Sequence, residues 1–171
     1  MSILAEEIVE EWLNRQGYFT IRGVKLGVDE IDILAIKLVG KDVECRHIEI
    51  TASMRPVSYI SKVPKESQKK GRAANSIKRS PVELHQGVNE WVEKKFGKKK
   101  KLELMNKLWP GKWSKELVIN VVKSQEEIEL FRSHGIDIIH LKDIVKSIAN
   151  DKGVIESACG ADFLDLIQMA K

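Results

Sequence analysis

Two carboxylates on neighbouring strand-like segments are the residues of this sequence best suited to chemistry. Asp32 lies in EIDILAIKL, residues 30–38, and Glu49 lies in ECRHIEITA, residues 44–52. Side chains alternate between the faces of a strand, so a hairpin that pairs the two segments would point both carboxylates into one space. Two like charges at close range are unfavourable unless a cation lies between them or one carboxylate takes up a proton.

Carboxylate oxygens on a rigid sheet are the ligands that Mg²⁺ or Mn²⁺ prefers, with waters and a substrate phosphate completing the shell. The pattern therefore predicts a divalent-metal site between Asp32 and Glu49. His47 and Thr51 share a strand face with Glu49. A lone strand histidine is more typical of a supporting group than of a ligand. The alternative interpretation is an amphipathic hairpin whose carboxylates face water.

Hydrophobic periodicity predicts the elements that must position these residues. Leu4, Ile8 and Trp12 recur at helical spacing. The patterns predict a helix at 3–16, strands at 18–26, 30–38 and 44–52, a strand at 115–123, a helix at 124–135, a strand that becomes a helix at 136–148 and a closing helix at 160–170.

The strand–helix–strand unit at 115–141 requires a crossover, which predicts parallel strands. The fold class expected from this order is α/β, or more narrowly an α+β mixed β-sheet with helices on both faces. A length of 171 residues suits a single domain over 1–171. Ser124 is the expected N-cap of its helix, with Glu127 at the capping-box position.

The positive charge is concentrated in residues 55–113. This segment holds 16 of the 29 Lys and Arg but only 5 of the 25 Asp and Glu, so it carries +11 and the remainder −7. Such asymmetry favours a polyanionic partner, usually a nucleic acid. The alternative is a solvated lysine-rich insertion. We expect this insertion to be partly helical, at 65–79 and 82–96, with a basic loop at 97–101.

The N-terminal part of the chain resembles a known family. The segments AEEIVEEWLNRQGYF, VDEIDILAI and HIEIT are similar to the PD-(D/E)XK nuclease superfamily, which has the restriction-endonuclease-like fold. Archaeal Holliday-junction resolvases and Mrr-type restriction enzymes look closest. Their pattern is a helix glutamate, an aspartate on the second strand and a (D/E)-X-K motif on the third. The resemblance covers about the first 55 residues.

This resemblance implies a role for individual positions. Asp32 matches the motif aspartate and Glu49 the motif acid, and both are expected to bind Mg²⁺ or Mn²⁺. Glu6 best matches the helix glutamate by its spacing, with Glu10 and Glu7 as alternatives. The implied activity is metal-dependent hydrolysis of phosphodiester bonds, with DNA as the expected substrate.

Thr51 departs from the motif, because the family has lysine there to orient the attacking water and stabilise developing charge. We expect either a lysine-free site or a lysine imported from the following segment. Lys62, Lys65 and Lys69 are the candidates, and Gln68 is a candidate auxiliary group. The expected nucleic-acid contacts are Lys65, Lys69, Lys70, Arg72, Lys78 and Arg79.

Two competing functions remain open from the sequence. One is an inactive nuclease-like domain that binds nucleic acid or protein, and the other is a scaffold whose basic segment meets an acidic protein. Enzymes of this fold often act as dimers, so a homodimer is a further expectation. The N-terminus lacks the basic region of a secretory signal, and no apolar run reaches the roughly 18 residues of a membrane span, which favours a cytoplasmic protein without a membrane partner.

Overall fold

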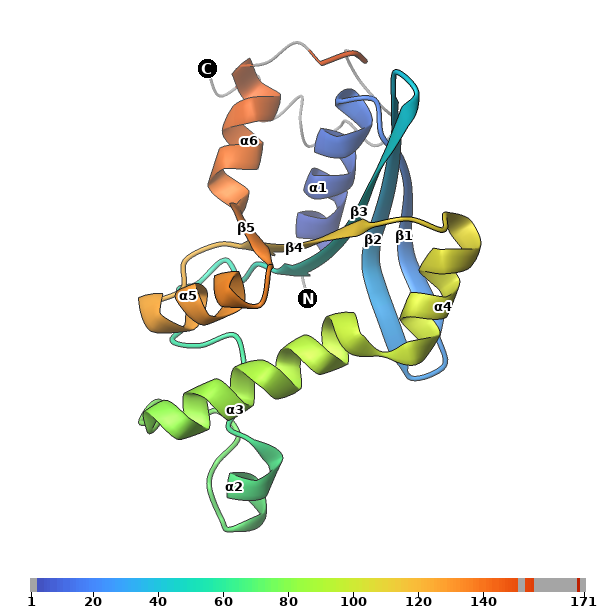
Figure 1. Cartoon of the computed structure of the whole chain (residues 1–171). Coiled ribbons are helices and arrows are strands. Elements are labelled where there is room, and N and C mark those ends of the chain that lie inside the picture. Colours follow the sequence, from blue (N-terminus) through green and yellow to red (C-terminus); the bar gives the residue numbers. More distant parts are fainter. Residues whose placement is uncertain (1–2, 151–152, 156–168, 170–171) are drawn as a thin grey trace.

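A mixed five-stranded sheet forms the centre of the molecule (Figure 1). The computed structural model describes residues 3–150, 153–155 and 169. The strands lie in the order β1-β2-β3-β4-β5: β1 Phe19–Leu26, β2 Asp29–Val39, β3 Asp42–Thr51, β4 Trp113–Ile119 and β5 Asp137–His140. β1, β2 and β3 form an antiparallel meander, whereas β4 is parallel to both β3 and β5. The parallel β4–β5 pair confirms the crossover prediction.

Helices cover both faces of this sheet. α1 (Ile3–Arg15) and α6 (Leu141–Asn150) pack on one face, where Val9 and Ile144 meet Ile48 and Ile50 of β3. The other face carries α3 (Pro81–Val92), the π-helical turn η1 (Glu93–Gly97), α4 (Lys99–Leu108) and α5 (Gln125–Ser133). The short α2 (Lys65–Lys69) projects from this side. The predicted mixed sheet with helices on both faces is confirmed.

The segment at 55–113 is the connection between the parallel strands β3 and β4, and its helices differ in part from the prediction. The predicted basic loop at 97–101 is wrong, because α4 begins at Lys99 and places Lys101 and Met105, one turn apart, in the interior. The predicted helix at 65–79 stops at Lys69. Gly71 then has a φ of 93°, a left-handed conformation that ends a helix.

The C-terminal part of the chain is described only up to α6 and at a few residues beyond it. The closing helix predicted at 160–170 lies outside the described residues except for residue 169. Among the helices that are described, none has the length and apolar character that a membrane span requires.

A buried carboxylate fixes the start of the β3–β4 connection against α5. Ser124 caps α5 as predicted, accepting from the Glu127 N–H at 3.2 Å. The Glu127 carboxylate points elsewhere: it accepts from the N–H groups of Ile60 and Ser61 at 2.7 and 2.9 Å and from the Ser61 hydroxyl at 2.5 Å. Gly87 of α3 passes so close to the Lys62 carbonyl that a Cβ would clash with it. These contacts hold residues 60–62 beneath α3.

We expect Glu127→Ala to lower the free energy of unfolding by about 2–4 kcal/mol, because three donors would lose their acceptor in a buried place. Glu126→Ala is the matched control, since Glu126 lies exposed in the same first turn of α5. Urea denaturation of both variants measures the difference. Equal stabilities would show that the Glu127 contacts do not hold the connection.

Candidate active site

The sheet brings Asp32 and Glu49 together on the face covered by η1 and α4. The β2–β3 ladder pairs Ile33 with Ile48 and Leu34 with His47, a register that sets Asp32 opposite Glu49. Asp32 is 1% exposed and Glu49 is fully buried. The Ile50 N–H donates to Asp32 Oδ2 at 2.7 Å and fixes this carboxylate against β3. The shared space expected from strand alternation is therefore present.

Two lysines from the β3–β4 connection meet this carboxylate pair. Lys95 of η1 places Nζ 2.5 Å from Glu49 Oε2 and 3.7 Å from Asp32 Oδ2. Lys101 of α4 donates to Glu49 Oε1 at 2.9 Å and to the Lys95 carbonyl at 2.8 Å. The ammonium of Lys95 thus lies between the carboxylates, in the place where two like charges require a cation.

His47 completes the surroundings of Glu49. Its Nε2 lies 3.0 Å from Glu49 Oε1, and its ring packs edge-on against Phe96 with 4.7 Å between centroids. Burial lowers the pKa of His47, and the hydrogen bond to Glu49 opposes this only in part. A neutral imidazole that donates from Nε2 orients the Glu49 carboxylate without adding a third full positive charge.

The two carboxylates differ in their affinity for protons. Burial and the neighbouring charge of Glu49 raise the pKa of Asp32 to about 7, although Lys95 and the Ile50 N–H oppose the shift. Burial would also raise the pKa of Glu49, but His47, Lys95 and Lys101 together hold it below its usual range. Asp32 Oδ1 is buried and has no hydrogen-bond partner among the described residues. The pair thus contains one fixed anion and one group that titrates near neutral pH.

The glutamates of α1 lie on the helix that packs against the opposite face of the sheet. Burial and Glu30 raise the pKa of Glu6, while Arg22 and Lys95 lower it, so Glu6 lies within electrostatic range of the central lysine. Glu10 accepts from Thr20 at 3.2 Å and pairs with Arg22 at 3.1 Å. Glu7 also faces Arg22, at 3.6 Å. Of the three candidates, Glu6 is the one whose pKa responds to Lys95, whereas Glu7 and Glu10 pair with Arg22.

The lysines expected to replace the motif lysine are not found at the site. Lys62, Lys65 and Lys69 are exposed, and none makes an ion pair with Asp32 or Glu49 in the described part of the chain. Gln68 donates to the Val63 carbonyl instead, at 2.5 Å. Thr51 is half-buried on β3 beside Ile119 of β4.

Sequence reasoning missed Lys95 and Lys101 because the run KKFGKKKK is typical of a solvated loop. One signal was available: Lys101 lies four residues before Met105, at the spacing of a buried helix face. Lys95 gave no comparable signal, because its direction depends on the wider π-helical turn at Glu93–Gly97.

A divalent cation at this place would find two protein carboxylates, Asp32 and Glu49. No cluster of three or more His, Cys, Asp or Glu suited to a metal occurs among the described residues. Mg²⁺ keeps several waters and often takes only one or two carboxylates from the protein. The unpaired Asp32 Oδ1 is an oxygen without a competing donor in the described part of the chain. A metal at this pair would share the space with the Lys95 ammonium.

The basic residues expected to contact nucleic acid lie in a projecting lobe at residues 64–80, here called the α2 lobe. Lys65, Lys69, Lys70 and Lys78 are exposed on it. Arg72 instead pairs with Glu83 at 3.0 Å. Arg79 is also engaged within the protein: it donates to Ser61 Oγ at 3.1 Å and stacks over Tyr59 with its Cζ 4.1 Å from the ring centroid.

We expect Asp32→Asn to raise the melting temperature at pH 8 and to have little effect at pH 4. An aspartate with a pKa of about 7 in the folded protein and about 3.9 in the unfolded chain stabilises the folded state fully below pH 4 and loses that contribution as pH rises to 7. Asparagine resembles the protonated, uncharged aspartate at every pH, so the variant does not lose this stability as the pH rises. Asp42→Asn, at an exposed position where β3 begins, is the control. A pH-independent difference in melting temperature would contradict the raised pKa.

Comparison with known proteins assigns no family to this chain. No family model matches it, and no curated protein matches it. One similar solved structure is described as "Crystal Structure of Protein of Unknown Function AF1548"; it is 16% identical, with a TM-score of 0.42. The match covers 87% of this chain and 60% of that chain, so this chain spans less than two thirds of its length.

Proposed function

We propose that the protein is a metal-dependent nuclease that hydrolyses phosphodiester bonds, with DNA as the expected substrate. The observation that carries this proposal is the position of Lys95, whose Nζ lies between Glu49 and Asp32 at 2.5 and 3.7 Å. Two carboxylates and a lysine are the three groups of the PD-(D/E)XK motif. Lys95 supplies the ammonium that Thr51 cannot supply, although it comes from a different element of the chain.

Each group has a distinct task in this reaction. Asp32 and Glu49 would hold Mg²⁺ or Mn²⁺, which when bound polarises the scissile phosphate and lowers the pKa of a coordinated water. Lys95 stabilises negative charge that develops on the phosphate, because its ammonium is already fixed and desolvated. Lys101 and His47 keep Glu49 ionised and oriented. Glu6, whose pKa responds to Lys95, would take the part of the motif's helix glutamate.

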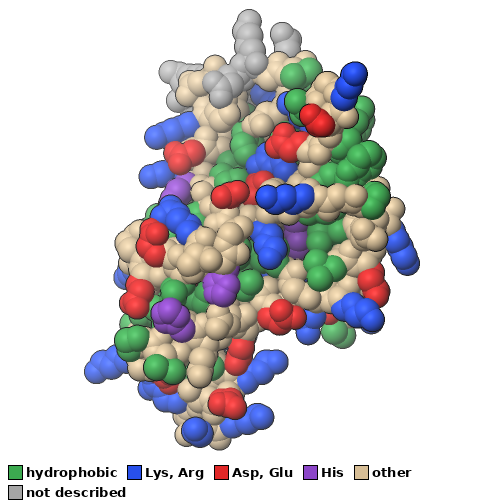
Figure 2. All heavy atoms as spheres, in the orientation of Figure 1, with side chains coloured by type: hydrophobic (Ala, Val, Ile, Leu, Met, Phe, Trp, Pro, Cys, Tyr) green, Lys and Arg blue, Asp and Glu red, His purple; other side chains and the backbone are tan. Residues whose placement is uncertain are grey.

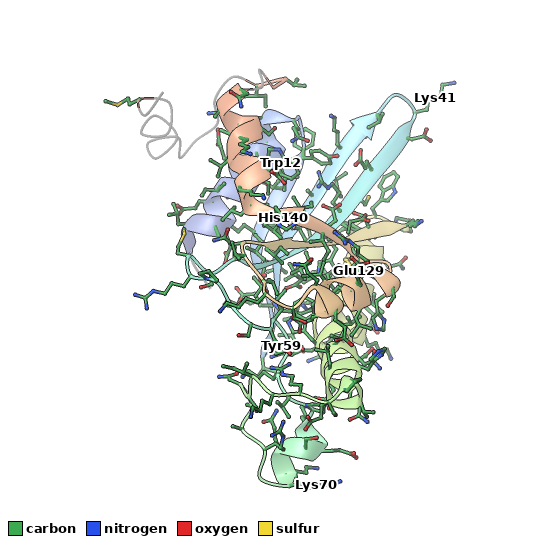
Figure 3. All side chains as sticks on the ribbon, turned by 90° about the vertical axis from the view of Figure 1, so that its left-hand side faces the viewer. Trp12, Lys41, Tyr59, Lys70, Glu129 and His140 are labelled. Atoms are coloured by element: carbon green, nitrogen blue, oxygen red, sulfur yellow. The ribbon has the colours of Figure 1, made fainter. Side chains whose placement is uncertain are left out.

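Binding of the substrate backbone is assigned to the α2 lobe. Lys70 lies at the far end of this lobe, and Lys41 marks the hairpin tip at the opposite end of the molecule (Figure 3). The lobe's exposed lysines have no carboxylate partner among the described residues, whereas Arg72 and Arg79 are engaged within the protein. Backbone phosphates would be held by these ammonium groups rather than by bidentate arginines.

A second function is favoured by a different feature of the same site. Both Glu49 oxygens already have ammonium partners, Lys101 on Oε1 and Lys95 on Oε2. A carboxylate so neutralised needs no metal, and this arrangement suits an inactive domain that binds nucleic acid. The two functions differ in one measurable property, which is whether a divalent cation displaces the Lys95 ammonium.

Lys95→Met separates these functions. It removes the competing ammonium, so we expect Mg²⁺ or Mn²⁺ to bind more tightly by calorimetry, while cleavage falls by about 10²–10³-fold for the loss of one preorganised electrostatic contact. Plasmid, single-stranded and branched DNA with either metal, and with EDTA, are the substrates. Lys94→Met is the control, because Lys94 is the exposed neighbour in the same turn. Absence of both metal binding and cleavage in the wild type would leave the inactive binding domain.

We expect Lys69→Glu with Lys70→Glu to weaken DNA binding on every sequence and to reduce its salt dependence, because phosphate contacts release counterions and carry no base information. Lys142→Glu with Lys146→Glu is a control of equal charge on α6, on the opposite face of the sheet. Fluorescence anisotropy at several salt concentrations in EDTA measures both. Equal weakening by the two pairs would show that net charge, rather than the α2 lobe, determines the affinity.

A further inference from the structure

A pocket beside the carboxylate pair is not used by the proposed reaction. It has a volume of about 340 Å³ and lies between β4 and α4, where hydrophobic side chains are visible on the surface (Figure 2). This volume is at the small end of the roughly 300–1,000 Å³ typical of ligand pockets. The pocket is lined in part by His47, Phe96, Asn106, Trp113, Ser114 and Lys115.

The pocket has apolar and aromatic walls. Phe96 is buried, and Trp113 packs on the cluster that contains Met105. The Trp113 indole is fixed by a hydrogen bond from its Nε1 to the Trp109 carbonyl at 3.1 Å. A fixed indole at the pocket wall can stack on a planar ring without a large loss of side-chain entropy.

Polar groups are available for a ligand at the same place. The side chains of Asn106 and Lys115 are exposed and make no hydrogen bond or ion pair to another residue in the part of the chain that is described. Asn106 presents both a donor and an acceptor, as the edge of a heterocyclic ring requires. Lys115 presents an ammonium suited to phosphate. By contrast, the Ser114 hydroxyl already donates to Glu116, at 2.6 Å.

The pocket adjoins the carboxylate pair through one side chain. His47 contributes to the pocket wall and also lies 3.0 Å from Glu49 Oε1, on the same face of β3. A ring that fills the pocket would therefore contact the group that orients Glu49. This continuity, together with the net charge of +11 in residues 55–113, favours a ligand that belongs to a polyanionic chain.

We propose that the pocket holds one unstacked nucleobase of a single-stranded segment, with a flanking phosphate at Lys115. The proposal rests on the proposed function and specifies its substrate: a strand that is single-stranded, or opened, beside the bond to be cut. A duplex would have to expose a base by leaving its stack, which costs free energy that a single strand does not need.

The test compares dT12 with an abasic twelve-residue strand of equal charge by competition anisotropy in EDTA, where no cleavage occurs. We expect the abasic strand to bind the wild type about tenfold more weakly, as loss of one base stacking contact implies. Asn106→Trp fills the pocket from an exposed helix position and should remove this difference. Lys115→Glu should weaken both strands more than Lys107→Glu, its control on exposed α4 surface outside the pocket.

Three binding results would overturn the pocket assignment. They are equal affinity of the wild type for both strands, an unchanged difference in Asn106→Trp, and binding of thymidine monophosphate as tight as that of dT12, which would indicate a site for a free nucleotide. Circular dichroism verifies folding of each variant. Base-dependent binding without cleavage would support the pocket and contradict the nuclease activity. Cleavage that Asn106→Trp leaves unchanged would support the nuclease activity and contradict the pocket.

Discussion

The arrangement of this molecule depends on the burial of two carboxylates side by side. Asp32 and Glu49 are almost inaccessible to solvent, and like charges so placed destabilise a fold unless a cation or a proton compensates them. Lys95 supplies part of the compensation, and partial protonation of Asp32 near neutral pH supplies more. Apolar residues at these positions would remove the need for this compensation, because they carry no charge that must be desolvated.

The lysines that neutralise the carboxylate pair, Lys95 and Lys101, belong to the connection between β3 and β4. Parallel neighbours require a long crossover, and this one crosses the sheet as α3, η1 and α4. Glu127 anchors its beginning, through Ile60 and Ser61. The π-helical turn then sets the direction of Lys95, and one turn of α4 sets that of Lys101. The connection is thus held at both ends, by Glu127 at residues 60 and 61 and by Glu49 at Lys95 and Lys101.

Strand alternation predicted that Asp32 and Glu49 would share a space if a hairpin paired their segments. The short turn between Val39 and Asp42 then fixes the register that sets them opposite each other. The parallel β4–β5 pair followed from chain connectivity for a similar reason. The lysines could not be placed this way. Their side chains are long, their local composition is that of a solvated loop, and their burial is decided by Glu49, which lies 46 and 52 residues away in sequence. Glu127 was likewise expected to cap its own helix through its carboxylate, but the carboxylate accepts from the N–H groups of Ile60 and Ser61, which are distant in sequence.

An ammonium group reaches the carboxylate pair from Lys95 of η1, whereas β3 itself has a threonine at position 51. A lysine can place its ammonium beside the carboxylate pair either from the strand itself or from a helix that packs across the sheet. Because Lys95 belongs to η1 and Lys101 to α4, a shift of these helices relative to the sheet would move both ammonium groups, whereas a lysine on β3 would stay with the sheet. A ligand that shifts α4 through Asn106 or Met105 would also shift Lys101. The pocket wall and the Lys101–Glu49 ion pair thus depend on the same helix, α4.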